Sequence, residues 1–239
     1  MKRKFVVFDI DGTYFRFHLY WEINLALARE NKLHPDINQL ALDRYEAWRR
    51  RANATAFEDF DTMTVEKINE LLAEIDPVPY DKHMPEILEP LLDYTYVYPK
   101  KLKEELQKQG YMTLAISGSR TEEVSLFAKH HGFDDWVGQT WHRTPDGKKF
   151  TGKISPTYKD KHLFLQQFID KHNLTLEDSI AVGDTAGDIS MFEMVENPIV
   201  FNPNHILLEH AKKQGWKIVV ERKSIAYTLE KRDGRYILA

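Results

Sequence analysis

Five short runs along the chain consist almost entirely of apolar residues. They are Phe5–Phe8, Met112–Ile116, Ile180–Val182, Ile199–Phe201 and Ile218–Val220. Continuous apolarity, in contrast to alternation of apolar and polar residues, is typical of strands that are covered on both faces, as in a parallel sheet. We therefore predict that these runs form the strands of a buried sheet.

Helical patterns lie between most of these runs. Three of them end at a glycine, the residue that most readily adopts the left-handed conformation in which helices often terminate. These glycines are Gly110, Gly132 and Gly215, and a fourth helix is predicted over Lys161–His172. Strands that alternate with helices predict an open α/β sheet with right-handed crossovers.

The stretch from Leu19 to Tyr94 breaks this alternation. It contains two strongly helical pieces, Ile37–Arg51 and Val65–Ile75, and four prolines punctuate its second half. No run of the buried-strand type occurs in it. We interpret this stretch as a helical insert between the first strand and the rest of the sheet.

A second irregular segment, Trp141–Ser155, is predicted to form two polar strands joined by a hairpin turn at Asp146-Gly147. We assign it to the sheet domain. The predicted boundaries are 1–17 and 95–239 for an α/β core and 18–94 for the helical insert.

Polar and acidic residues follow three of the predicted strands at the point where each ends. The ligands of an open parallel sheet bind beyond the carboxyl ends of its strands. The residues at these ends are Asp9 and Asp11; Ser117, Gly118, Ser119 and Arg120; and Gly183, Asp184, Thr185 and Asp188. Because the pattern recurs at successive strand ends, it predicts one functional site at this edge of the sheet.

Asp9 and Asp11 stand two residues apart directly after a buried strand. Like charges at that spacing repel each other. A cation, a shared proton or different roles for the two carboxylates would make the arrangement tolerable.

Composition and charge exclude several classes of function. The 239 residues suffice for one large domain or a domain with an insert, and a net charge of −4 argues against a nucleic-acid partner. No apolar stretch is long enough to span a bilayer, and the basic start MKRK precedes only four apolar residues, which argues against a secretory signal. We expect neither nucleic acid nor a membrane as a partner.

Cysteine is absent from the sequence, which excludes disulfides, thiolate nucleophiles and cysteine-ligated zinc. Without an export signal, the cytoplasm is the expected location. His130 and His131 are adjacent and should point in different directions on a helix. We therefore expect them at the solvated surface, without a metal role.

Four elements together resemble a known family. They are DIDGT at Asp9–Thr13, Ser117-Gly118, Lys161, and GDTAGD at Gly183–Asp188. In this order and with the helical insert between the first two, they resemble the four motifs of the haloacid dehalogenase-like hydrolase superfamily. Residues 176–192 are similar to its phosphoserine-phosphatase-like branch. The resemblance covers roughly residues 1–17 and 95–225 and implies a Rossmann-like, three-layer parallel-sheet core with an inserted α-helical cap.

The resemblance implies phosphoryl transfer. Asp9 would attack phosphorus and form an aspartyl-phosphate, and Asp11 would act as general acid and then as general base. Lys161 would supply a cation. Enzymes of this superfamily that cleave carbon–halogen or carbon–phosphorus bonds lack an acid at the position of Asp11, so the substrate is expected to be a phosphate ester or anhydride.

Binding roles are implied in the same way. The Ser117 hydroxyl and the Gly118 amide would hold a phosphate oxygen, with help from Thr13. Mg²⁺, which prefers oxygen ligands, would be the cofactor. Its expected ligands are Asp9, the backbone carbonyl of Asp11, and Asp184, with Asp188 behind them or acting through water.

Simpler interpretations exist for several of these residues. Lys159 lies two residues from Lys161, and either lysine could be a solvated residue at a helix start. Asp188 could serve only the start of a helix, since carboxylates favour that end of the helix dipole. Ser119 and Arg120 are expected to belong to a helix start as well.

Arg16 and His18 follow the first motif closely enough to reach a substrate. The aromatic residues around them could line a pocket or, as we favour, fasten insert to core. Phosphoserine phosphatases carry a glutamate near the position of His18 that holds the substrate amine, but no acid lies between Asp11 and Glu22. This departure argues against phosphoserine as the substrate.

The sequence as a whole predicts a Mg²⁺-dependent phosphatase acting on a small-molecule phosphate monoester. Two alternatives remain open. One is a phosphotransferase that passes the group to an acceptor other than water. The other is a regulatory module that binds magnesium or phosphate without turnover.

Overall fold

The computed structural model describes residues 2–53, 55–223 and 225–238, which form two compact units. The core unit comprises the described residues up to His18, residues 92–138 and the described residues from 156 onward. The helical unit comprises residues 19–91 and 139–155. The predicted boundaries differ mainly in the second irregular segment, Trp141–Ser155: the sequence predicts it as part of the core, whereas the structure groups it with the helices.

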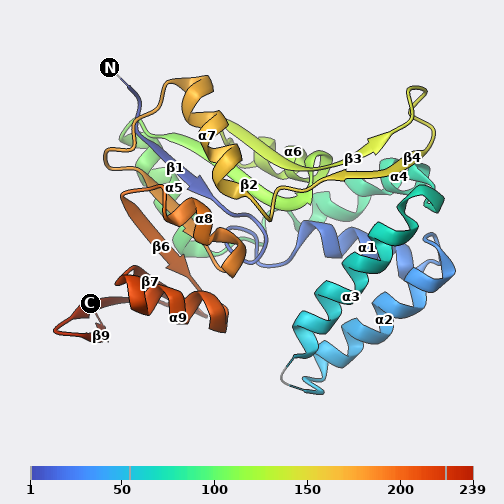
Figure 1. The fold of residues 1–239 in the computed structure, drawn as a ribbon, viewed down its shortest axis with the longest axis horizontal. Coiled ribbons are helices and arrows are strands. Elements are labelled where there is room, and N and C mark those ends of the chain that lie inside the picture. The colour runs from blue at the N-terminus through green and yellow to red at the C-terminus, as the bar shows by residue number, and fades with distance from the viewer. Residues whose placement is uncertain (1, 54, 224, 239) are drawn as a thin grey trace. The chain divides into compact units, whose positions relative to one another are not determined.

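The core unit alternates strands and helices (Figure 1). Its strands are β1 (Phe5–Phe8), β2 (Met112–Arg120), the first part of β3 (Asp135–Arg143), β5 (Ile180–Gly183), β6 (Asn197–Phe201), β7 (Lys217–Arg222), β8 (Ile225–Arg232) and β9 (Arg235–Leu238). Its helices are α5 (Val97–Lys108), α6 (Thr121–His130), α7 (Lys161–His172), the short 3₁₀ turn Ala186–Asp188, α8 (Ile189–Phe192) and α9 (His205–Gln214).

In its described residues, 19–53, 55–91 and 139–155, the helical unit contains four α-helices and a β-hairpin. Its elements are α1 (Leu19–Arg29), α2 (Pro35–Arg49), α3 (Ala56–Leu71), the 3₁₀ turns Leu72–Glu74 and Glu89–Leu91, α4 (Pro77–Leu88), the second part of β3, and β4 (Phe150–Ser155). β4 pairs antiparallel with β3, and Trp141 from this hairpin packs edge-to-face on Tyr80 of α4 at a centroid distance of 5.4 Å. Arg143 donates two hydrogen bonds to Asp81 of the same helix. These contacts explain why the hairpin belongs with the helices.

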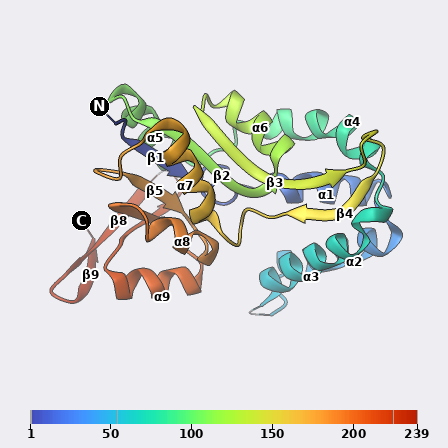
Figure 2. The same cartoon turned by 45° about the horizontal axis from the view of Figure 1, so that its top comes forward.

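The sheet of the core unit has the strand order β3-β2-β1-β5-β6-β7-β8-β9. β1 pairs parallel with β2 on one side and with β5 on the other, and β5, β6 and β7 continue the parallel ladder. β8 and β9 add antiparallel strands at one edge (Figure 2). The central strand β1 therefore has its carboxyl end between those of β2 and β5.

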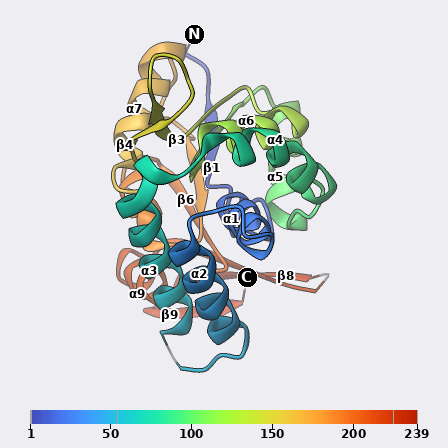
Figure 3. The same ribbon diagram turned by 90° about the vertical axis from the view of Figure 1, so that its right-hand side faces the viewer.

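Helices cover both faces of this sheet, with α7 and α9 on one face and α5 and α6 on the other (Figure 3). Phe5 and Val7 of β1 join a buried cluster with residues of α7, α8 and α9. On the opposite face, Phe8 packs edge-to-face on Tyr14 and Phe133. Both sides of β1 are thus apolar, which is why its sequence shows no alternation. The predicted α/β fold of three layers is confirmed.

The structure also departs from the sequence predictions. β2 continues through Ser117 to Arg120, where we expected the strand to end and a loop to begin. The helices α1 and α4 and the C-terminal hairpin of β8 and β9 had no counterpart among the predicted elements. None of the described helices is both long and apolar enough to cross a lipid bilayer.

Candidate active site

Acidic and hydroxyl side chains meet at the carboxyl ends of β2, β1 and β5, the three adjacent central strands of the core unit. Asp9 directly follows β1, and its backbone N–H donates to the Val182 carbonyl at 2.8 Å. This bond continues the ladder between β1 and β5. It therefore fixes the backbone from which the Asp9 side chain projects.

Lys161 pairs with two of these carboxylates. Its Nζ lies 2.6 Å from Asp9 Oδ1 and 2.6 Å from Asp188 Oδ1. All three side chains are buried. Lys161 is the first residue of α7, so the start of that helix delivers the cation. The neighbouring Lys159 is exposed and lies over the ring of Tyr158 at 5.8 Å, so it is Lys161 that reaches the carboxylates.

Asp188 organises the loop after β5. While its Oδ1 accepts from Lys161, its Oδ2 accepts from the backbone N–H groups of Asp184 at 3.0 Å and Thr185 at 2.9 Å. A Cβ at Gly183 would lie 2.4 Å from Asp188 Cγ, so the close approach requires glycine there. Asp188 thereby orients both the lysine and the loop that carries Asp184.

Asp184 packs against the loop after β1. The Thr13 hydroxyl donates to Asp184 Oδ1 at 3.1 Å, so Thr13 lies on the Asp184 side of the site. Gly12 has a φ of +81°, and a Cβ there would lie 2.4 Å from Asp184 Oδ2. Glycine is therefore required at position 12 for two reasons: the backbone is left-handed, and a side chain would occupy the space of the Asp184 carboxylate.

Asp11 has different partners from Asp9. The hydroxyls of Ser117 and Ser119 both donate to Asp11 Oδ2, at 2.5 Å and 2.8 Å. The Ser119 N–H in turn donates to Ser117 Oγ at 2.9 Å. Because β2 continues through Arg120, these alternate residues point to the same side of the strand. Ser119 was expected to serve a helix start, and its contact with Asp11 follows from the longer strand.

The loop before α7 supports β2 from another direction. The buried Thr157 hydroxyl donates to the Ser117 carbonyl. This bond anchors the backbone of the Ser117-Gly118 pair. Thr157 carries no motif signal in the sequence, because its role depends on the fold of the loop.

Arg120 ends β2 and is the N-cap residue of α6, as expected for a residue at a helix start. Its Nε lies 3.2 Å from Glu123 Oε1, and its backbone N–H donates to Glu123 Oε2 at 3.0 Å. Both side chains are buried, and burial raises the pKa of Glu123 to about 7. The pair fixes the turn directly after the serines.

The buried carboxylates outnumber the buried lysine. Burial raises the pKa of Asp184 well above its usual range, and the negative charges of Asp9 and Asp188 raise it further. Burial also raises the pKa of Asp9, while the Lys161 charge opposes that rise. For Lys161, burial lowers the pKa, but Asp188 and Asp9 together raise it above the usual value. The cluster is thus short of positive charge.

The donor set fits a hard divalent cation. Asp9, Asp184 and Asp188 each offer a carboxylate oxygen, and these oxygens lie within 4.8 Å of one another. Oxygen ligands in this number suit Mg²⁺, which keeps several of its waters. Since both Asp188 oxygens already accept hydrogen bonds, Asp9 and Asp184 are better placed as direct ligands, with Asp188 behind them.

Arg16 and His18 lie in the segment that leaves the first motif. The Arg16 N–H donates to the Tyr94 carbonyl at 2.9 Å, and its exposed guanidinium lies over the Tyr96 ring at 5.6 Å. Burial raises the pKa of Tyr96, and the charge of Asp184 adds to that rise. His18 is half-buried at the end of the first core segment.

Comparison with known proteins gives a family match. The family model of haloacid dehalogenase-like hydrolases matches residues 6–193. A curated phosphoserine phosphatase from Methanocaldococcus jannaschii is 25% identical over 237 residues, covering 96% of this chain and 97% of the relative.

Solved structures resemble the fold. A crystal structure of a protein of unknown function from Bordetella pertussis Tohama I superposes with a TM-score of 0.67 at 21% identity, covering 91% of this chain and 98% of that chain. A phospho-aspartyl intermediate analogue of phosphoserine phosphatase superposes with a TM-score of 0.61 at 24% identity, covering 94% of this chain and 96% of that one.

Proposed function

This chain belongs to the haloacid dehalogenase-like hydrolase family, and from that membership we propose that it is a Mg²⁺-dependent phosphatase acting on a small-molecule phosphate monoester. Asp9 is the nucleophile and Asp11 the general acid and base. The similarity to a curated phosphoserine phosphatase supports phosphoric monoester hydrolysis as the reaction class.

The observation that carries this proposal is the different surroundings of the two carboxylates. Asp9 pairs with Lys161 at 2.6 Å, whereas Asp11 accepts hydrogen bonds from Ser117 and Ser119. The ammonium charge of Lys161 opposes the rise that burial causes in the pKa of Asp9, which favours the ionised form that attacks. The hydroxyl contacts of Asp11 give it a different environment, which suits it to proton exchange. Distinct environments assign distinct roles to paired carboxylates.

In the first step an Asp9 carboxylate oxygen forms a bond to phosphorus, and the bond from phosphorus to the ester oxygen breaks. Asp11 donates its proton to that departing oxygen, which leaves as an alcohol. The product on the enzyme is an aspartyl-phosphate at Asp9. In the second step Asp11 takes a proton from water, the water oxygen bonds to phosphorus, and Asp9 is released as a carboxylate.

Other residues of this site would hold the phosphate. The Gly118 amide and the Ser117 hydroxyl would bind a phosphate oxygen, for which the Ser117 hydroxyl would have to exchange Asp11 as its partner. Lys161 would offset charge on the transferred group, since phosphoryl transfer depends chiefly on positioning and charge stabilisation. Asp9, the Asp11 carbonyl and Asp184 would hold Mg²⁺, which when bound supplies further positive charge.

The identity of the ester belongs to the same proposal. Relatives named as phosphoserine phosphatases make phosphoserine the first compound to test. The segment between Asp11 and Glu22 contains Arg16 and His18 and lacks an acid that could hold an ammonium group. We therefore expect an ester other than phosphoserine to be the better substrate, with Arg16 and His18 near its leaving group.

The test is phosphate release from a panel of phosphate esters that includes phosphoserine, with and without Mg²⁺. Asp9→Asn and Asp11→Asn are assayed in parallel, and Lys159→Met serves as the control for an exposed charge near the site. We expect Mg²⁺-dependent turnover by the wild type and the control, and a loss of about a thousandfold or more in both variants.

Three outcomes would contradict the proposal. Full turnover by Asp9→Asn would exclude Asp9 as the nucleophile. Transfer of the phosphoryl group to an added alcohol in preference to water would make the protein a phosphotransferase. Stoichiometric Mg²⁺ or phosphate binding without turnover on any ester would favour a regulatory module.

A further inference from the structure

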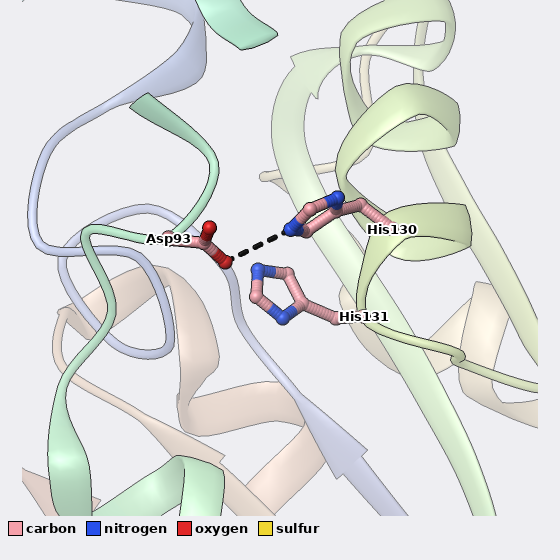
Figure 4. A group of neighbouring side chains, drawn as sticks. All are labelled: Asp93, His130 and His131. Carbon is pink, nitrogen blue, oxygen red and sulfur yellow. Dashed lines mark hydrogen bonds and ion pairs between the residues drawn. The ribbon is translucent and has the colours of Figure 1, made fainter. Parts of the chain in front are cut away.

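A second cluster of metal-ligating side chains lies in the core unit, apart from the proposed phosphatase residues. It consists of Asp93, His130 and His131, shown in Figure 4. His130 Nε2 donates to Asp93 Oδ1 at 2.9 Å, and the two imidazole rings lie 4.8 Å apart at an angle of 85°. One ligand atom from each residue lies within 4.8 Å of the other two.

The two histidines were expected to point in different directions, and that prediction was wrong. α6 ends at His130, and His131 follows the helix with a φ of −90° and a ψ of 2°. Residues 92–93 lie beside this helix end and provide a hydrogen-bond acceptor for each ring. His131 Nε2 donates to the Leu92 carbonyl at 2.9 Å, and His130 Nε2 donates to the side chain of Asp93, the residue that follows Leu92.

We propose that Asp93, His130 and His131 form a binding site for a divalent transition-metal ion of the Zn²⁺ type. Two imidazole nitrogens and one carboxylate oxygen are a donor set that such ions prefer. The site is distinct from the Asp9, Asp184 and Asp188 cluster, whose ligands are all oxygen and therefore suit Mg²⁺.

The cluster is open enough for an ion to enter. The Asp93 side chain is 79% exposed and that of His130 is 40% exposed. Water can therefore fill the remaining coordination positions. In contrast, Asp9 and Asp188 are buried beside Lys161, so the two clusters differ in access as well as in ligand type.

Packing holds the His131 ring in place independently of its hydrogen bond. The ring lies 4.4 Å from that of Phe127 and 5.3 Å from that of Tyr14. An ion bound at Nε2 would take the place of the proton now shared with the Leu92 carbonyl, and that proton would move to Nδ1. His130 would likewise move its Nε2 proton, now donated to Asp93, to Nδ1. Both imidazoles stay neutral in this exchange, and the metal replaces two hydrogen bonds.

Binding would also have a structural effect. Leu92 is the first residue of the core unit after the helical unit in sequence, and Asp93 follows it. An ion held by Asp93 and the two histidines would tie this returning segment to the end of α6. The site would thus stabilise the core unit whatever substrate the phosphatase site accepts.

The test is calorimetric titration of the wild-type protein with Zn²⁺ in the presence of excess Mg²⁺, which is added to compete with Zn²⁺ for the carboxylate cluster. Asp93→Asn and His130→Ala remove one ligand each, and His205→Ala removes another exposed imidazole as a control. We expect one ion per chain, affinity at least about tenfold weaker in both ligand variants, and unchanged affinity in the control.

Asp93→Asn separates the metal site from a purely structural contact. Asparagine has the shape of aspartate and its side-chain oxygen still accepts from His130, so a hydrogen bond that only anchors the segment survives. The thermal midpoint of this variant without metal should match the wild type, whereas the rise on adding Zn²⁺ should shrink. Equal Zn²⁺ affinity in all four proteins, or no binding to the wild type, would overturn the proposal.

Discussion

The ammonium group of Lys161 lies 2.6 Å from Asp9 Oδ1, although 152 residues separate the two in sequence. Both side chains are buried, as is Asp188, the second partner of the lysine. A buried charge is tolerated only when it is paired. The stability of the core unit and the chemistry proposed for Asp9 therefore depend on the same lysine.

Replacing Lys161 by methionine should destabilise the protein. The variant leaves two buried carboxylates without their cation, and removing one partner of a buried ion pair costs about 3–5 kcal/mol. Urea unfolding monitored by circular dichroism measures this loss, and phosphatase activity should fall with it. Lys159→Met is the matched control, because that exposed residue should change the free energy of unfolding by no more than about 0.5 kcal/mol. Equal stability of the two variants would contradict the pairing.

Alanine at Gly12 should disturb Asp184. The new Cβ would lie 2.4 Å from Asp184 Oδ2 at a backbone φ of +81°. A displacement of about 1 Å can cost about a hundredfold in activity, so we expect a fall in kcat of that order and a higher Mg²⁺ requirement. Gly110→Ala is the control, since its φ is +87° but no atom lies within 4 Å of the added Cβ. A similar effect of both substitutions on activity would show that backbone strain, not Asp184, is responsible.

The Ser119 hydroxyl should contribute to the role of Asp11. Ser119→Ala removes a donor 2.8 Å from Asp11 Oδ2 while the Ser117 donor remains. An ordinary hydrogen bond contributes about 0.5–1.5 kcal/mol, which corresponds to a loss of about 2- to 10-fold in kcat. Steady-state kinetics measure this, with Ser125→Ala on α6 as the control. Wild-type kcat in Ser119→Ala would limit the serine to a packing role.

The alkaline stability of the protein should reflect Lys103. Burial lowers the pKa of this lysine from 10.5 to about 8, and it donates to the His131 carbonyl at 2.8 Å. Between these pH values the unfolded chain binds the proton and the folded chain does not, so the free energy of unfolding rises with pH. Wild type should therefore gain stability relative to Lys103→Met as the pH rises from about 8 toward 10.5. Urea unfolding across this range measures the difference, and a constant difference would contradict the lowered pKa.

The strands of the parallel sheet could be predicted because their signal is local. β1 occupies Phe5–Phe8, the predicted run, and β2, β5, β6 and β7 contain the other four apolar runs. Each strand is covered on both faces, so its consecutive residues are apolar and a short stretch of sequence is enough to recognise it. The helix predicted at Lys161–His172 likewise matches α7.

Other elements escaped prediction because their local signal is weak or misleading. α4 contains Pro85 in its interior, where proline usually interrupts a helix. Its formation depends on burial of Tyr80 and Leu88 within the helical unit. β8 and β9 are largely exposed antiparallel strands, so their sequences show no buried run. They form because β8 pairs with the edge strand β7 and β9 then pairs with β8.

The sequence by itself determined which residues stand at the ends of the central strands, because the acidic and hydroxyl positions directly follow apolar runs. Only the tertiary structure decided how they pair. The start of α7 brings Lys161 rather than Lys159 to Asp9, the extended β2 turns Ser119 toward Asp11, and the end of α6 directs two adjacent histidines to one segment. Spacing along a chain sets the local direction of a side chain, but the partner that it meets is set by elements far away in sequence.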